Sequence, residues 1–188
     1  LSSIAKSLLV VAGKQEIRGV SFDQLAYLVS SARREKFSTT TRIVEDEAGK
    51  IWVKKRPTSG VDEVAEGRIT LTRCDSPWID RPSLEAVVSE RCQAGTSALA
   101  QKGIEQIFAP CEPWLRFLET DSVQRAGQRY VTGDFVDCTW DDVFIDGDGL
   151  QRVDEEWRWA DGIPMNVVVI RAIYYFLIKI EGVPGLPG

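Results

Sequence analysis

Alternating apolar and polar positions predict a β-hairpin in the first half of the chain. Residues 39–45 are rich in β-branched side chains, and residues 47–50 have the composition of a turn. Residues 51–53 begin a returning strand, and two lysines, Lys54 and Lys55, follow it directly. A hairpin that ends in lysines is therefore expected here.

A second hairpin is predicted in the other half of the chain. Residues 143–145 form a short apolar strand, and residues 150–153 form the returning strand. Residues 146–149 alternate aspartate with glycine, which tolerates positive φ and favours a tight turn. Such a hairpin brings Asp142 and Asp154 to the same open end.

Helical spacing of apolar residues, together with N-cap residues, predicts the remaining elements. Ser83 is the expected N-cap of one helix, and Trp114, Leu115 and Leu118 are expected in the core. The expected helical segments are residues 21–29, 84–92, 97–108, 113–118 and 164–180.

The last of these segments, residues 164–180, is apolar on nearly every face, which predicts a buried helix. Burial against another domain is the alternative. Arg171 interrupts the apolar run and is expected to pair with an acid such as Glu155 or Glu156. The run is shorter than the roughly 20 residues that a bilayer requires, so no membrane span is expected.

Three aspartates, Asp137, Asp142 and Asp154, are the candidate functional residues because they surround the second hairpin. Two carboxylates at adjacent strand ends, with a third just upstream, suit a divalent cation bound to a polyphosphate. Mg²⁺ prefers oxygen ligands and takes few of them from the protein. An acidic, solvent-exposed hairpin without a metal would have the same composition, since Asp and Gly form turns in any case.

At these residues the chain resembles the protein-kinase-like superfamily. The spacing Asp-x4-Asp, followed by a hairpin and a further Asp, is similar to the catalytic loop and metal-binding segment of that superfamily. More narrowly, the run VDCTWDDVFIDGDGLQRVDEEW at residues 136–157 is similar to divergent kinase-like domains. These domains are found with bacterial methyltransferases and glycosyltransferases of surface-polysaccharide assembly.

The resemblance implies a role for each aspartate. It places Asp137 as the base that orients the acceptor hydroxyl, Asp154 as the principal Mg²⁺ ligand, and Asp142 where a metal-binding Asn is usual. The chain departs from the pattern at Phe135, in place of the familiar His, and at Trp140, where the narrower family often has Pro. There is also no glycine-rich phosphate loop. A degraded, inactive kinase would show such departures.

The resemblance also implies that one lysine of the first hairpin binds the ATP phosphates. Inward-facing Ile51 and Val53 would place Lys55 on the same face, which favours Lys55. Alignment of Ile-Trp-Val-Lys with the family's Val-Ala-Ile-Lys favours Lys54. Two ordinary edge-strand lysines remain the alternative.

In that superfamily a glutamate on a following helix holds the lysine, and Glu63 and Glu66 are the candidates here. Residues 55–77 are too few for a full helix and two strands, which average about 11 and 5 residues each. Either this part is reduced or residues are absent from the sequence.

The implied fold is α+β: a two-lobed protein-kinase-like fold with a reduced N-lobe β-sheet and a mainly helical C-lobe. Residues 1–36 are expected to be a leader or linker helix region, residues 37–76 the N-lobe, and residues 77–188 the hinge and C-lobe. The start of the chain lacks the features of a signal peptide, and the absence of an initiating Met suggests a fragment.

The composition of the chain limits the classes of protein and of functional site that are expected. With 188 residues, 44% of them hydrophobic and 27% charged, the chain has the composition of a soluble globular domain. A net charge of −5 disfavours a nucleic-acid surface, which needs clustered Lys and Arg. The absence of His and of any C-x-x-C spacing disfavours a zinc site and a Ser-His-Asp site. Four scattered cysteines favour reduced thiols and a cytoplasmic protein.

The sequence therefore predicts a phosphotransferase that uses ATP and Mg²⁺ and acts on a hydroxyl of a glycan or small molecule, in cell-surface polysaccharide assembly. A neighbouring enzyme domain or subunit is a further expected partner. The alternative is a catalytically inactive kinase-like module, or a structural subunit, that mediates protein–protein interaction.

Overall fold

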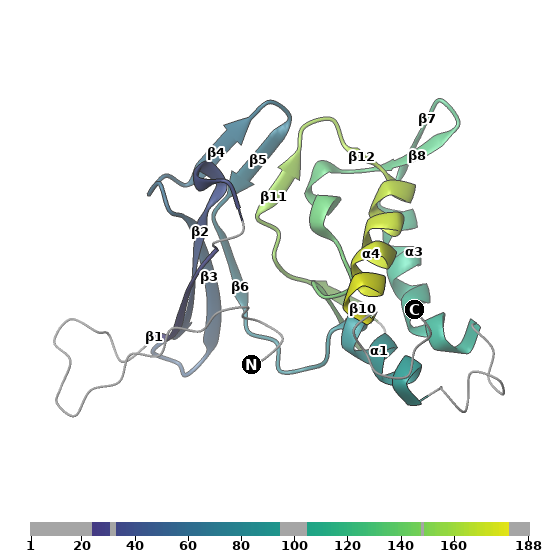
Figure 1. Ribbon diagram of the computed structural model, residues 1–188, viewed down its shortest axis with the longest axis horizontal. Coiled ribbons are helices and arrows are strands. Elements are labelled where there is room, and N and C mark those ends of the chain that lie inside the picture. Colours follow the sequence, from purple (N-terminus) through teal and green to yellow (C-terminus); the bar gives the residue numbers. More distant parts are fainter. Residues whose placement is uncertain (1–23, 31–32, 95–104, 148, 181–188) are drawn as a thin grey trace, which may run out of the picture. The chain divides into compact units, whose positions relative to one another are not determined.

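The protein is α+β in a computed structural model that combines short antiparallel strands with helices (Figure 1). The α+β class expected from the sequence is thereby confirmed. The structure describes residues 24–30, 33–94, 105–147 and 149–180.

The chain divides into two compact units, residues 1–79 and residues 80–188. The sequence placed the expected lobe boundary between residues 76 and 77, whereas the structural division falls after Ile79. The first unit consists mainly of strands, and the second combines helices with short strands.

The first unit is built on a four-stranded antiparallel sheet in the order β1-β2-β3-β6. Its central hairpin is the one predicted from the sequence, with Thr39 opposite Pro57 and Glu45 opposite Ile51. The Asp46 carboxylate closes the turn by accepting hydrogen bonds from the backbone N–H groups of Ala48 and Lys50. The strands are β1 (Gln24–Val29), β2 (Thr39–Glu45), β3 (Ile51–Pro57) and β6 (Cys74–Pro77).

The prediction of a helix at residues 21–29 is wrong for residues 24–29, the part of it that the structure describes. Residues 24–29 form strand β1, which pairs with β2 and places Tyr27 opposite Arg42. Pairing with β2 satisfies the backbone hydrogen bonds of this segment, and tertiary pairing of this kind overrides a local helical pattern. Residues 1–23, the greater part of the expected leader, lie outside the described residues.

A short 3-10 helix η1 (Glu35–Phe37) precedes β2, and a second hairpin completes the first unit. Its strands are β4 (Glu63–Glu66) and β5 (Ile69–Thr72). Residues 55–79 are all described and contain no helix. The helix that would carry a lysine-binding glutamate is therefore absent from this segment, and both candidate glutamates lie on a strand.

Among the described residues, the second unit has one hydrophobic core, to which α-helical, 3-10 helical and strand residues all contribute. Ser83 caps the first helix as predicted, because its Oγ accepts a hydrogen bond of 3.3 Å from the backbone N–H of Ala86. The α-helices are α1 (Leu84–Ala94), α3 (Glu112–Thr120) and α4 (Met165–Ile180). The 3-10 helices are η2 (Ala109–Cys111) and η3 (Gly133–Asp137).

Short antiparallel strands complete this unit. The hairpin of β9 (Val143–Asp146) and β10 (Gly149–Arg152) is the one predicted from the sequence, with Val143 opposite Arg152. The other strands are β7 (Val123–Arg125), β8 (Gln128–Val131), β11 (Trp157–Trp159) and β12 (Ile163–Pro164). Of the helix expected at residues 97–108, residues 105–108 are helical and the rest lie outside the described residues.

Helix α4 is not buried on all sides, so this expectation is wrong. Its buried stripe consists of Val168, Ala172 and Phe176, spaced four residues apart on one face. Several large apolar side chains on its other faces are exposed to solvent. Among the described helices, none is both long and apolar enough to cross a membrane.

Two neighbouring residues on α3 provide a test of this core. Trp114 is 1% exposed and packs edge-on against Trp140, whereas Leu115, also expected in the core, is 38% exposed. We expect Trp114→Ala to lower the free energy of unfolding by about 3–5 kcal/mol, because it leaves a large cavity. Leu115→Ala, the matched control, should cost at most about 1 kcal/mol. Denaturant unfolding of both variants measures the difference, and equal losses would contradict this core.

Candidate functional site

The candidate site is the acidic loop, defined here as residues 137–142, together with the hairpin that follows it. The loop begins at the end of η3, which lies very close to β11. A Cβ added at Gly133 would lie 1.6 Å from the carbonyl oxygen of Trp159, so only glycine fits there. This close approach fixes the start of the segment that carries Asp137.

Trp140 anchors the middle of the acidic loop in the core. Its side chain is 3% exposed, and its ring centroid lies 5.2 Å from that of Phe176 and 5.9 Å from that of Trp114. Its backbone carbonyl accepts a hydrogen bond of 2.9 Å from the N–H of Glu85 in the first turn of α1. The indole thus packs between Trp114 of α3 and Phe176 of α4.

Phe135, at the position where the resemblance would have a His, is a core residue. It is 4% exposed, and its ring centroid lies 5.4 Å from that of Phe117 on α3. The guanidinium of Arg152 lies over the other side, 4.2 Å from the ring centroid. Arg152 is itself largely buried and pairs with Glu155 at 2.5 Å. The Phe135 ring thus takes part in a cation–π contact with Arg152.

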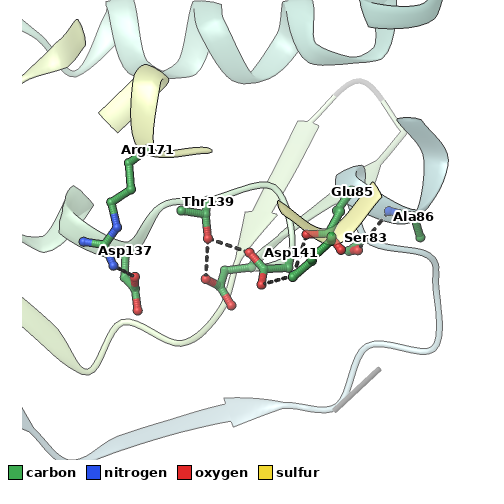
Figure 2. Close-up of polar contacts among 9 residues, drawn as sticks. Ser83, Glu85, Ala86, Asp137, Thr139, Asp141 and Arg171 are labelled. Atoms are coloured by element: carbon green, nitrogen blue, oxygen red, sulfur yellow. Dashed lines mark hydrogen bonds and ion pairs between the residues drawn. The ribbon is translucent and has the colours of Figure 1, made fainter. Parts of the chain in front are cut away.

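Arg171 of α4 holds the carboxylate of Asp137 (Figure 2). Its Nη2 lies 2.6 Å from Asp137 Oδ1, and its Nη1 donates a hydrogen bond of 2.8 Å to the carbonyl of Val136. Arg171 thus pairs with an acid, as expected, but the acid is Asp137 and neither of the two glutamates named as examples. The guanidinium forks between a carboxylate and the adjacent backbone carbonyl, which fixes the orientation of the Asp137 side chain.

A second polar cluster fixes the other end of the acidic loop. The hydroxyl of Thr139 donates to Asp141 Oδ1 at 2.5 Å and also lies 3.1 Å from Asp142 Oδ2 (Figure 2). Lys179 of α4 reaches Asp141 at 2.8 Å and Glu85 at 2.6 Å. Helix α4 therefore holds the loop at two points, through Arg171 at its start and through Lys179 near its end.

The hairpin brings Asp142 and Asp154 to the same end, as the sequence predicted. Val143 pairs with Arg152, and one residue further the N–H of Val153 donates a hydrogen bond of 2.9 Å to the carbonyl of Asp142. Asp154 follows directly with a positive φ of 64°. Asp tolerates this left-handed conformation better than most residues, and the turn ends the strand pairing at the site.

The donor set of this hairpin end suits Mg²⁺ bound together with phosphate. Among the described residues, no group of three or more His, Cys, Asp or Glu side chains is arranged to hold a metal ion alone. Asp142 and Asp154 offer hard carboxylate oxygens, and Mg²⁺ is commonly bound by one or two carboxylates plus phosphate oxygens and water.

The register of β3 distinguishes the two candidate lysines. Lys55 lies opposite Thr41 and on the same face as Val53, which pairs with buried Ile43. Lys54 lies on the other face of the strand, opposite Asp75 of β6. The register thus places Lys55 on the face of Ile51 and Val53, but residues 51–56 are all half-buried, so the choice of Lys55 stays a prediction.

The candidate glutamates Glu63 and Glu66 are both exposed on β4, at opposite ends of the strand. Glu66 forms a salt bridge of 3.5 Å with Lys36. The lysine in this salt bridge is therefore neither of the two candidates for phosphate binding, Lys54 and Lys55.

A thiol nucleophile in the acidic loop is disfavoured. Burial raises the pKa of Cys138 to about 11, and burial raises that of Cys111 to about 12. Both thiols therefore stay protonated near neutral pH, whereas the thiolate is the reactive form.

Sequence reasoning missed the residues that position the site: Thr139, Asp141, Arg152 and Lys179. Lys179 is 38 residues from Asp141 in sequence, and no local pattern connects the two. The contacts of Thr139 with Asp141 and of Arg152 with Glu155 are local in sequence, two and three residues apart, so these two could have been found from the sequence.

Comparison of the chain with protein-family models, with curated proteins and with solved structures gives no match.

The ion pairs of Lys179 with Asp141 and Glu85 predict that the stability of the fold decreases in acid. Burial raises the pKa of Asp141, but hydrogen bonds from Lys179 and Thr139 outweigh it, so this pKa lies below the usual 3.8. A carboxyl whose pKa is lowered by folding stabilises the fold above its unfolded pKa and loses that contribution as the pH falls through the folded value. We expect Asp141→Asn to lose about 0.5–1 kcal/mol at pH 7, because the pair is partly exposed, and much less at pH 2.

Urea unfolding of the wild type and the variant at both pH values tests this. Lys179→Met should give the same pattern because it removes the partner of the same pair. Asp121→Asn, an exposed change outside the cluster, is the control. A loss from Asp141→Asn that is equal at pH 7 and pH 2 would contradict the assigned linkage.

Proposed function

We propose that the protein is a phosphotransferase of the kinase-like superfamily that transfers a phosphoryl group from ATP to a hydroxyl, with Mg²⁺. The observation that supports this most is the hydrogen bond from the Val153 N–H to the Asp142 carbonyl. It sets Asp142 and Asp154 at one end of a hairpin, a short distance along the chain from Asp137. Phosphotransferases of this class need such a trio: two metal ligands and one residue that orients the acceptor.

In this proposal Asp154 is the principal metal ligand and Asp142 the second. When bound, Mg²⁺ neutralises charge on the phosphate oxygens. Because Asp142 replaces the usual Asn, the site has one additional negative charge. The hydroxyl of Thr139 lies 3.1 Å from Asp142 Oδ2, but its single proton is directed at the nearer Asp141 carboxylate, so bound Mg²⁺ would have to offset the added charge.

Asp137 orients the acceptor hydroxyl and accepts its proton. Arg171 supports this role because it holds the carboxylate at 2.6 Å and the preceding carbonyl at 2.8 Å. Positioning of this kind supplies most of the rate in phosphoryl transfer, where little covalent chemistry is required of the protein.

For the lysine that binds the ATP phosphates, the register of β3 favours Lys55 over Lys54. The glutamate that would hold this lysine is less well supported, since Glu63 and Glu66 lie on a strand and not on a helix. The two-lobed kinase-like fold is part of the proposal and accounts for the two units of the chain.

The acceptor class comes from the resemblance alone: a glycan or other small hydroxyl compound of the cell envelope, handled in surface-polysaccharide assembly. Such an acceptor, with ATP, would be met in the cytoplasm, next to a partner enzyme domain or subunit. Tight ion pairing makes the acidic loop rigid before any substrate binds, which suits a site that positions a small hydroxyl.

The second candidate is a catalytically inactive kinase-like module, or a structural subunit, that binds another protein. Two observations favour it. Residues 55–79 contain no helix to hold the phosphate-binding lysine, and α4 exposes a continuous apolar face. Nucleotide binding separates the two candidates.

Calorimetric titration with ATP, with and without Mg²⁺, is the first test. We expect saturable binding that requires Mg²⁺, and we expect Asp154→Ala to weaken it at least about tenfold while the fold is retained, because this carboxylate binds metal. Asp146→Ala is the matched control: Asp146 lies at the opposite end of the same hairpin, in a salt bridge with Arg81.

Circular dichroism of both variants checks that each is folded. Equal affinities in wild type and Asp154→Ala would remove Asp154 from the metal site. No ATP binding by folded wild-type protein would reject the phosphotransferase and favour the inactive module.

Asp137→Asn separates binding from transfer. We expect ATP affinity to stay within about twofold, and the Mg²⁺-dependent transfer of the γ-phosphoryl group to fall by about 10²–10⁴-fold, because the amide cannot accept a proton. Phosphate release to water and transfer to a panel of simple sugars measure the second quantity. Asp134→Asn, the same change within the same 3-10 helix, should retain transfer. Full turnover in Asp137→Asn would contradict the role of Asp137.

A further inference from the structure

Helix α4 has two apolar faces on opposite sides, and only one of them is packed against the core. The buried face consists of Val168, Ala172 and Phe176, each at most 2% exposed. Successive residues of an α-helix turn by about 100°, so residues 167, 170, 174 and 177 lie on the opposite side. We call these four the outer α4 seam: Val167, Ile170, Tyr174 and Leu177.

The outer α4 seam is exposed along its whole length. Its four side chains are 48%, 63%, 59% and 51% exposed, in chain order. Their spacing of three and four residues is that of the a and d positions of a coiled coil, which form the contact between two helices. Ile173 and Ile178 flank the seam and are 40% and 49% exposed.

The exposed area is large enough for a helix interface. Large side chains have total surfaces of about 150–250 Å², so the seam and its two flanking isoleucines expose roughly 600 Å². A monomer's largest apolar patch is about 300–600 Å², and a stable complex buries about 800 Å² on each partner. The seam would thus supply most of one side of a specific interface.

The order of residues along the seam fits a second copy of the same helix. The seam is symmetric about position 172: Val167 and Leu177 lie five residues to either side, and Ile170 and Tyr174 lie two residues to either side. In an antiparallel pair related by a two-fold axis at this position, Val167 meets Leu177 and Ile170 meets Tyr174. A two-fold interface is self-complementary in this way, because each contact occurs twice.

The charges near the seam are compatible with this pairing. Arg171 and Lys179 are the charged residues of α4, and both already form salt bridges within their own chain, to Asp137 and Asp141. Two copies would therefore bring together apolar side chains and neutralised pairs. An anionic membrane surface fits less well, since helices that lie on membranes present unpaired Lys and Arg along their polar face.

We infer that two copies of this chain associate through the outer α4 seam as an antiparallel, two-fold symmetric helix pair. The inference goes beyond the proposed phosphotransferase and does not depend on it. Pairing covers the second apolar face of a helix whose composition is that of a helix buried on both sides.

Sedimentation velocity of the 188-residue protein over a hundredfold range of concentration tests the association. We expect a dimer for the wild type, and a loss of roughly tenfold or more in the association constant for Ile170→Glu, since a carboxylate would be buried in an apolar contact. Val123→Glu is the matched control: Val123 on β7 is 51% exposed and lies outside the seam, so the dimer should persist. Circular dichroism checks that each variant is folded.

Cross-linking tests the orientation. Chains with Val167→Cys, mixed with chains with Leu177→Cys and treated with a short bismaleimide, should form the mixed cross-linked dimer. Either variant alone should cross-link no more than the wild type.

A monomer at all concentrations would overturn the inference, including a monomer that binds anionic lipid vesicles. A dimer unaffected by Ile170→Glu, a larger open assembly, or efficient cross-linking of Val167→Cys alone would do the same.

Discussion

Burial of the Trp140 indole is the physical constraint on which the candidate site depends. Trp140 belongs to a polar loop that carries three aspartates and one threonine. Its ring nevertheless packs among Phe108, Trp114 and Phe176. Its carbonyl also accepts the hydrogen bond from Glu85 that starts α1. Moving so large a buried ring would open a cavity, which is costly in a closely packed core. The carboxylates on either side of Trp140 are therefore held in place by hydrophobic packing.

Helix α4 joins that packing to the electrostatics of the loop. Phe176 forms part of the aromatic cluster, while Arg171 and Lys179 on the same helix hold Asp137 and Asp141. Partly exposed ion pairs of this kind contribute little to stability, typically about 0–1 kcal/mol. Their more important effect is on orientation, because a rigid helix fixes both cations relative to the buried ring. A change in the packing of α4 would therefore alter the loop without touching an aspartate.

The sequence predicted the elements whose causes are local and failed where tertiary contacts decide. Both hairpins followed from turn residues and β-branched strands, and the Ser83 cap followed from its position before an apolar stripe. The shared end of Asp142 and Asp154 followed from the hairpin itself. The partner of Arg171 could not be predicted in this way. Asp137 lies 34 residues upstream of Arg171, and nothing in the local sequence distinguishes it from the nearer glutamates. Residues 24–29 became a strand because β2 offered backbone partners, which no local pattern reveals.

The error about α4 is the most informative of these differences. A sequence pattern reports how much apolar surface a helix has, but not what covers each face. In this chain the core covers the face of Val168 and Phe176, and the face of Ile170 and Tyr174 remains exposed. Burial of that second face by a second copy would reconcile the all-round apolar pattern with the observed packing. It would also place the contact on the helix that orients Asp137, so that association and loop geometry would be coupled through one rigid element.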